Sequence, residues 1–227
     1  MLFRSLSDRD VVHTDVREAI EVLLGCESDM RLSDKEGNTA LHLVISHHPR
    51  LLQQIIENGG NVNAVNVHGC TPLHRAAYAR SSGKHARILL RAGASVHCKD
   101  KLGNTPLHIA IMRGSYDIAK VLIKKGSDVN TTNIQGRTCL HMASYRRSKE
   151  ILEQIILHGG QVNAVDELGS TPLHLAGLQK KTGRVVKGLL KHGSDPNAID
   201  YKGSTPLHVA CCSGNKVVAS HLIDHGR

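Results

Sequence analysis

The tetrapeptide Thr-x-Leu-His occurs six times along this chain of 227 residues, at nearly constant spacing. The copies begin at Thr39, Thr71, Thr105, Thr138, Thr171 and Thr205. Successive copies are 32, 34, 33, 33 and 34 residues apart. A period of this length is typical of proteins built from stacked repeats, in which each repeat packs only against its neighbours. We therefore expect one elongated array, although the length alone would also allow one or two globular domains.

Residues 100–132 show how each period is expected to fold. Thr105 is a typical helix N-cap, and Pro106 suits the first helical position because its missing N–H needs no partner there. His108 lies where the side chain of a capping box can reach back to the cap. A short helix is predicted from Pro106 to Met112. A second helix is predicted from about Tyr116, with an apolar stripe at helical spacing and a closing glycine at Gly126. Each unit is thus predicted to be turn, helix, loop, helix, loop.

These residues resemble the signature of the ankyrin-repeat family. The shared pattern is Asp-x-x-Gly-x-Thr-Pro-Leu-His, followed by Leu-Leu and by Gly-Ala/Ser-Asp-Val-Asn. It divides the chain into six repeats, at 34–65, 66–99, 100–132, 133–165, 166–199 and 200–227. Residues 1–33 are expected to form a degenerate N-terminal capping repeat, because Val16–Leu24 fits a second helix but the tetrapeptide is missing. The resemblance implies an all-α solenoid of stacked antiparallel helix pairs with projecting β-hairpin-like loops.

The resemblance also implies a function. Loops and first helices of this family form a concave face, members usually bind proteins there, and they are not usually enzymes. We therefore expect a non-catalytic protein–protein interaction module, which acts as an adaptor, scaffold or regulator. It is expected to need no cofactor and no small-molecule substrate, and to be a monomer by itself.

The charge of the chain bears on the partner. Lys and Arg number 29 against 20 Asp and Glu, which gives a formal net charge of +9. This excess favours an acidic protein partner. The alternative is a basic solenoid that binds nucleic acid or an anionic surface. Single-strand binders add stacking aromatic residues, and this chain has one Phe, four Tyr and no Trp, so nucleic acid is the less favoured partner. No stretch approaches the length of about 20 apolar residues that spans a bilayer, so no membrane association is expected.

Variable positions in a regular repeat are free to specify a partner. The variable residues at and just beyond the ends of the first helices are expected to line up side by side in the stack, and we call this set the ribbon: Tyr78, Arg80, Met112, Arg113, Tyr145, Arg146, Arg147, Leu178, Lys180 and Lys181. Tyr, Met and Arg are enriched at protein interfaces. At the loop tips, Lys101, Leu102 and Tyr201 are further candidate contacts, although single exposed apolar residues are common in any protein.

No catalytic residue and no metal ligand is assigned. Six of the 16 histidines belong to the tetrapeptide, where they have a structural interpretation, and the six cysteines include no Cys-x-x-Cys pair. Because the N-terminus does not resemble a signal peptide, a cytoplasmic or nuclear protein with reduced cysteines is expected. Asn130 is a candidate modification site, since Leu122, Asp128 and Val129 around it resemble the ankyrin pattern that an asparaginyl hydroxylase of animal cells reads. The alternative is that Asn130 only stabilises its loop.

Overall fold

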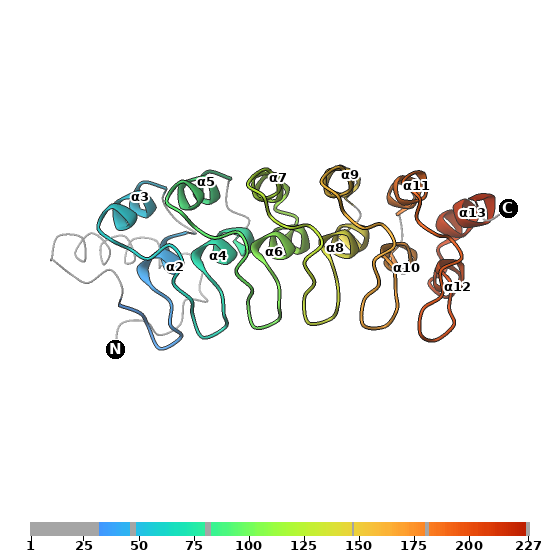
Figure 1. Cartoon of the computed structure of the whole chain (residues 1–227), viewed down its shortest axis with the longest axis horizontal. Helices are drawn as coiled ribbons and strands as arrows, with labels where there is room; N and C mark the ends of the chain where they lie inside the picture. Colours follow the sequence, from blue (N-terminus) through green and yellow to red (C-terminus); the bar gives the residue numbers. More distant parts are fainter. Residues whose placement is uncertain (1–31, 46–48, 80–82, 147, 180–181, 226–227) are drawn as a thin grey trace.

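The computed structural model describes residues 32–45, 49–79, 83–146, 148–179 and 182–225 and shows an elongated array of helix pairs (Figure 1). The described helices are α2 (Ala40–Val44), α3 (Pro49–Glu57), α4 (Pro72–Tyr78), α5 (Gly83–Arg91), α6 (Pro106–Arg113), α7 (Tyr116–Lys124), α8 (Cys139–Arg146), α9 (Lys149–Leu157), α10 (Pro172–Leu178), α11 (Gly183–Lys191), α12 (Pro206–Cys212) and α13 (Lys216–His225). The predicted all-α solenoid is confirmed.

The helices form two rows (Figure 1). The even-numbered helices α2 to α12 lie nearest the projecting loops and are called the inner helices, and the odd-numbered helices α3 to α13 are called the outer helices. Each helix packs against its own partner and against its counterparts in the neighbouring pairs, so that α6 contacts α4, α7 and α8. One helix pair falls in each of the six units predicted from the sequence. The exact unit boundaries stay predictions, and most of the predicted capping repeat at 1–33 lies outside the described residues.

The capping signal starts the inner helices as predicted. Thr105 has an extended backbone at the N-cap of α6, and its hydroxyl oxygen accepts a hydrogen bond from the backbone N–H of His108, three residues into the helix. The side chain of His108 reaches back to the backbone N–H of Thr105, which completes the capping box. Gly114 ends α6 in the left-handed conformation, with φ 73°. The helix includes Arg113 and is therefore one residue longer than predicted.

The core is thin and aliphatic. Leu107 and Ile111 of α6 are fully buried against Ile118 and Leu122 of α7. Similar pairs of helices repeat this layer along the array, and small residues such as Ala110 let neighbouring inner helices approach closely. Because each pair buries its apolar face only by stacking on the next pair, the array positions the ends of successive inner helices in a regular row.

The projecting loops stack on one another through their backbones. In the third loop, the Asp100 carboxylate accepts backbone N–H groups from Leu102 and Asn104 at 2.9 and 2.8 Å, which closes a tight turn. The backbone N–H of Ile134 in the next loop then donates to the carbonyl oxygen of Leu102 at 3.1 Å. Within the described part of the chain these loops contain no regular strand, only an isolated bridge between Ser33 and Thr39.

Candidate functional site

The exposed ends of the inner helices carry the described part of the ribbon. Tyr78, Met112, Tyr145 and Leu178 occupy equivalent positions near the C-terminal ends of α4, α6, α8 and α10, and all four are exposed. Because these inner helices pack against one another in order, the four side chains follow one another along the array. Four further predicted members, Arg80, Arg147, Lys180 and Lys181, lie outside the described residues. The structure therefore brings together six of the ten ribbon residues, including Arg113 and Arg146.

Two ribbon residues from neighbouring units contact each other directly. The guanidinium carbon of Arg113 on α6 lies 4.1 Å from the ring centroid of Tyr78 on α4. A cation over an aromatic face is attracted by the ring quadrupole. The contact holds both long side chains on the exposed inner face and reduces the conformational freedom that they would lose on binding a partner.

The inner helices contain no acidic residue. None of the described sequences of α2, α4, α6, α8, α10 and α12 includes Asp or Glu, whereas Arg75, Arg113 and Arg146 are all exposed. Across the described residues these three arginines form no ion pair within 4.0 Å. The described inner helices are therefore locally cationic. The neighbouring loops do carry carboxylates: Asp200 accepts N–H groups from Lys202 and Ser204 in its own turn, and these hydrogen bonds lower its pKa and favour the ionised form.

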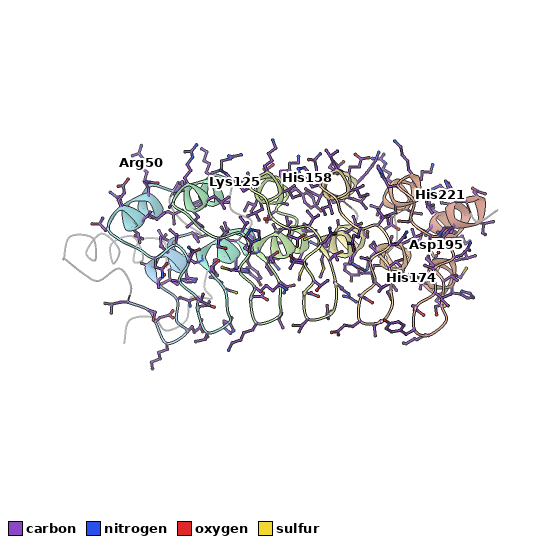
Figure 2. All side chains as sticks on the ribbon, viewed as in Figure 1. Arg50, Lys125, His158, His174, Asp195 and His221 are labelled. Carbon is purple, nitrogen blue, oxygen red and sulfur yellow. The ribbon has the colours of Figure 1, made fainter. Side chains whose placement is uncertain are left out.

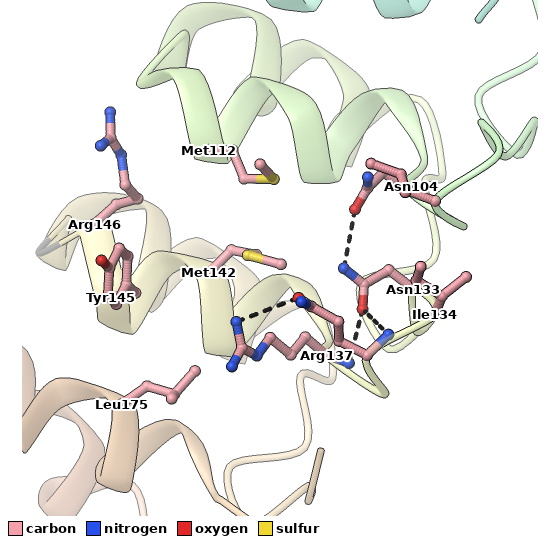
Figure 3. A pocket seen from close by; sticks show the side chains of 11 residues that line it. Asn104, Met112, Asn133, Ile134, Arg137, Met142, Tyr145, Arg146 and Leu175 are labelled. Atoms are coloured by element: carbon pink, nitrogen blue, oxygen red, sulfur yellow. Dashed lines mark hydrogen bonds between the residues drawn. The ribbon is translucent and has the colours of Figure 1, made fainter. Parts of the chain in front are cut away.

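A hollow of about 450 Å³ opens on this face between α6, α8, α10 and two loops (Figure 3). Its apolar lining consists of Leu102, Met112, Ile134, Met142, Tyr145 and Leu175. The side chains of Met142 and Leu175 are buried, whereas those of the other four apolar lining residues are exposed. The volume falls in the range of sites that hold a small molecule or one part of a larger ligand.

The polar side chains on the loop side of the hollow bond to one another. The Nδ2 group of Asn133 donates to Oδ1 of Asn104 at 3.0 Å, and Oδ1 of Asn133 accepts the backbone N–H groups of Gln135 and Arg137. Nη1 of Arg137 donates to Oε1 of Gln135 at 3.3 Å (Figure 3). Nε of Arg137 donates to Oδ2 of Asp166 at 3.1 Å. Asp166 is buried, so the charge of Arg137 is largely neutralised by this ion pair.

Sequence reasoning missed Met142, Leu175 and Arg137 as lining residues. Met142 and Leu175 directly follow the histidine of the tetrapeptide, where the six units carry five different residue types, and that variability is the signal that could have found them. Arg75 occupies the same position on α4. Among the predicted loop-tip contacts, all exposed, Leu102 lines the hollow, whereas Lys101 and Tyr201 do not.

The tetrapeptide histidines have structural roles. The backbone N–H of Thr105 donates to Nδ1 of His108 at 3.3 Å, so Nδ1 carries no proton and Nε2 donates to the carbonyl oxygen of Arg137 at 3.2 Å. Burial lowers the pKa of His108 from 6.5 to about 4, which keeps the ring neutral. Burial likewise raises the pKa of the Cys139 thiol. The part of the chain that the structure describes contains no cluster of three or more His, Cys, Asp or Glu suited to a metal ion.

Asn130 joins two units. Its Nδ2 group donates to the carbonyl oxygen of Gly159 at 2.8 Å, and its Oδ1 atom accepts the backbone N–H of Gln161 at 2.9 Å. Asn63 makes the equivalent bonds to Gly93 and Ser95. The side chain therefore stabilises the stacking of successive units, and hydroxylation of Asn130 stays a prediction.

Comparison with known proteins identifies the repeat. The family profile described as "Ankyrin repeats (3 copies)" matches residues 11–100, 81–166 and 140–227. A stretch of 96 residues is 34% identical to "E3 ubiquitin-protein ligase KEG" of Arabidopsis thaliana. This stretch covers 41% of this chain and 6% of that protein. "Putative ankyrin repeat protein FPV031" of Fowlpox virus is 39% identical over 36% of this chain and 26% of its own length. "NF-kappa-B inhibitor alpha" of Gallus gallus is 37% identical over 36% of this chain and 27% of its own length. The alignments thus span between 6% and 27% of these relatives.

Proposed function

The chain belongs to the ankyrin-repeat family, and on this premise we propose that it is a non-catalytic module that binds an acidic protein partner on its inner face. Ankyrin repeats are protein–protein interaction modules, and the repeat domain itself is typically non-catalytic. The family resemblance predicts that the loops and inner helices form the concave side of the array, which offers one continuous docking surface.

One observation supports the proposal that the partner is acidic: the described inner helices contain three exposed arginines and no carboxylate. A surface of one charge sign attracts partners of the opposite sign and speeds their association. The cations stand among exposed Tyr78, Met112, Tyr145 and Leu178. Apolar and aromatic anchors beside arginine are the composition of energetically important positions in protein interfaces.

Binding of nucleic acid is the second candidate, and a specific feature of the outer helices favours it. Helices α5 and α11 each carry three exposed cations at the same three positions, Lys84, Arg87 and Arg91 on α5 and Arg184, Lys187 and Lys191 on α11. Phosphate groups bind such stripes by counterion release and without sequence preference. These stripes lack exposed aromatic residues, however, and the other outer helices α3, α7, α9 and α13 carry acidic residues as well.

The test compares two matched charge reversals. In one variant Arg113→Glu and Arg146→Glu change the inner face, and in the other Arg87→Glu and Lys187→Glu change the outer face by the same net charge. Both pairs are exposed, so both variants are expected to fold. Proteins captured by the wild-type chain are identified by mass spectrometry, and the dissociation constant of the main partner is then measured for all three chains at two salt concentrations.

The proposal predicts that the inner-face variant loses at least about tenfold in affinity, mainly for a partner with an acidic surface, and that the outer-face variant loses little. Equal affinities for all three chains contradict it. Mobility shifts with DNA and RNA at the same salt concentrations test the second candidate, which predicts that the outer-face variant loses binding.

The role of the interaction is also part of the proposal. One relative is named as an inhibitor and another as a ubiquitin-protein ligase, so the module either masks its partner or recruits it for another activity. We propose that it works as a monomer in the cytoplasm or nucleus. The five described cysteines are free thiols, which suits a reducing compartment. None of the described helices is long and apolar enough to cross a bilayer.

A further inference from the structure

We infer that the hollow between α6, α8 and α10 takes one large apolar side chain of the partner, and that Arg146 pairs with a carboxylate next to that side chain. The inference rests on the proposed function and specifies its partner as a segment in which Leu, Ile, Met or Phe adjoins Asp or Glu.

The shape and lining of the hollow favour an apolar occupant. Met142 and Leu175, which are 8% and 5% exposed, supply the buried apolar surface, and Met112 and Tyr145 stand beside them on α6 and α8. Leu102 and Ile134 close the loop side of the hollow. An apolar side chain that enters this space loses its contact with water on several sides at once. Two of the lining residues are methionines, whose flexible side chains adapt to apolar groups of different shapes.

The polar lining residues on the loop side offer little to a polar occupant. Asn104 and Asn133 bond to each other, and Arg137 is held by Asp166 and Gln135. A polar group placed against this wall has to compete with hydrogen bonds that already exist. Burial of a polar group without compensating bonds is costly, so these contacts select against polar side chains.

Arg146 is the lining cation that the described contacts leave available. Figure 3 shows its side chain beside Tyr145, away from Arg137 and the asparagine pair. The structure gives it no ion pair among the described residues, whereas Arg113, the corresponding arginine of α6, lies over the ring of Tyr78. A guanidinium binds a carboxylate through two parallel hydrogen bonds. A carboxylate on a neighbouring residue of the partner is within reach when the apolar side chain occupies the hollow.

The combination is specific to this part of the array. On α4 the position of Met142 is taken by Arg75, so the apolar lining is not repeated beside Tyr78. The next inner helix, α10, has Leu175 at this position but no arginine near its described C-terminal end. Among the described inner helices, α6 and α8 each combine an apolar lining residue with an exposed terminal arginine. Arg113 of α6 does not line the hollow and lies over the ring of Tyr78, so Arg146 of α8 is the terminal arginine that lines it.

The experiment uses a library of displayed random short peptides, selected on the intact chain. An enriched peptide is synthesised with a fluorophore, and its dissociation constant is measured by anisotropy. Leu102→Glu places a charge at the hollow, and Leu168→Glu is its matched control. Leu168 occupies the same loop position two units further on and does not line the hollow. Its side chain is 56% exposed, against 58% for Leu102. A double-mutant cycle combines Arg146→Gln in the chain with a change of the peptide's acidic residue, in which Asp is replaced by Asn or Glu by Gln.

The inference predicts enriched peptides in which a large apolar residue adjoins an acidic one. Replacement of that apolar residue by alanine weakens binding about ten- to a hundredfold. Leu102→Glu weakens binding at least about tenfold more than Leu168→Glu, and the cycle gives a coupling between Arg146 and the peptide carboxylate.

Other results overturn the inference or its premise separately. If Leu102→Glu and Leu168→Glu weaken binding equally, or if Arg146 shows no coupling with the peptide carboxylate, the inferred site is wrong. The proposed function still stands in that case, provided that binding depends on acidic peptide residues. Selection that enriches no peptide also overturns the inference. Enriched peptides without acidic residues contradict the acidic partner itself.

Discussion

The Nε2 atom of His141 donates a hydrogen bond of 3.0 Å to the carbonyl oxygen of Ser170, which lies 29 residues further along in the next unit. Its Nδ1 atom accepts the backbone N–H of Thr138 in its own capping box. The same bridge recurs along the array as His42 to Cys70, His74 to Asn104, His108 to Arg137 and His174 to Ser204. In these five units one side chain therefore caps the start of an inner helix and joins that helix to the following loop.

Two alanine substitutions separate these two roles. His108 is fully buried and makes both contacts, whereas His208 is exposed and makes the capping contacts to Thr205 in the last described helix pair. His108→Ala leaves the buried N–H of Thr105 without its partner and the carbonyl oxygen of Arg137 with the N–H of Asn133 alone, and is expected to lower the free energy of unfolding by about 3 kcal/mol. His208→Ala is expected to cost about 1 kcal/mol, the value of a helix cap. Urea denaturation at neutral pH measures both, and equal losses show that the bridge to the next unit contributes nothing.

The buried histidines also predict a loss of stability in mild acid. Burial lowers the pKa of His42, His74, His108 and His141 below the ordinary value of 6.5, and that of His108 falls to about 4. Below 6.5 the unfolded chain takes up protons that the folded chain does not, so the free energy of unfolding decreases as the pH falls. For His108 the decrease amounts to about 3 kcal/mol, complete near pH 4.

The measurement is the urea-unfolding free energy between about pH 7.5 and about pH 4.5. The wild-type chain is expected to be stable and insensitive to pH above about 7 and to weaken progressively below it. His108→Gln removes one titrating group, and its stability is expected to fall less steeply over the same interval. If the unfolding free energy of the wild type does not change with pH, these imidazole rings bind protons equally well in the folded and the unfolded chain.

Most of the fold could be predicted from the sequence because each unit repeats the same local signals. Thr105, Pro106 and Gly126 fix where helices begin and end by short-range physics, and the period fixes their stacking. The hollow could not be predicted, because it depends on how Met142, Leu175 and Ile134 of three different segments meet in space. The ion pair between Arg137 and Asp166 likewise depends on how two neighbouring loops meet. No local pattern in the sequence indicates that Arg137 is already paired and therefore less available to a partner.

Close stacking of the loops predicts different costs for two glycine substitutions. Gly93 and Gly103 have φ values of 89° and 73°, which side chains rarely adopt. A Cβ atom on Gly93 meets nothing within 4 Å, whereas one on Gly103 lies 2.9 Å from the backbone nitrogen of Ile134. Gly93→Ala is expected to cost about 1 kcal/mol from its backbone conformation alone. Gly103→Ala has to move the next loop as well and is expected to cost about 3 kcal/mol.

Thermal unfolding and peptide binding test this pair together. Because Ile134 lines the hollow, Gly103→Ala is expected to weaken binding of a peptide selected as described above, while Gly93→Ala leaves it unchanged. Equal midpoints of thermal unfolding for the two variants show that displacement of the next loop by a Cβ atom at position 103 costs no stability.

Asn130 allows its structural role and its predicted modification to be tested independently. Asn130→Ala removes two hydrogen bonds to the following unit, at 2.8 and 2.9 Å, and is expected to lower the free energy of unfolding by about 1 to 2 kcal/mol. Asn63→Ala, which removes equivalent bonds, is expected to cost the same. The flanking residues differ between the two sites, so only Asn130 is expected to gain one oxygen atom when the chain is produced in animal cells. Peptide mass spectrometry locates the added oxygen. An unmodified Asn130 peptide, or equal modification of Asn63 and Asn130, shows that the flanking pattern does not direct a hydroxylase to this loop and leaves Asn130 with its stacking role alone.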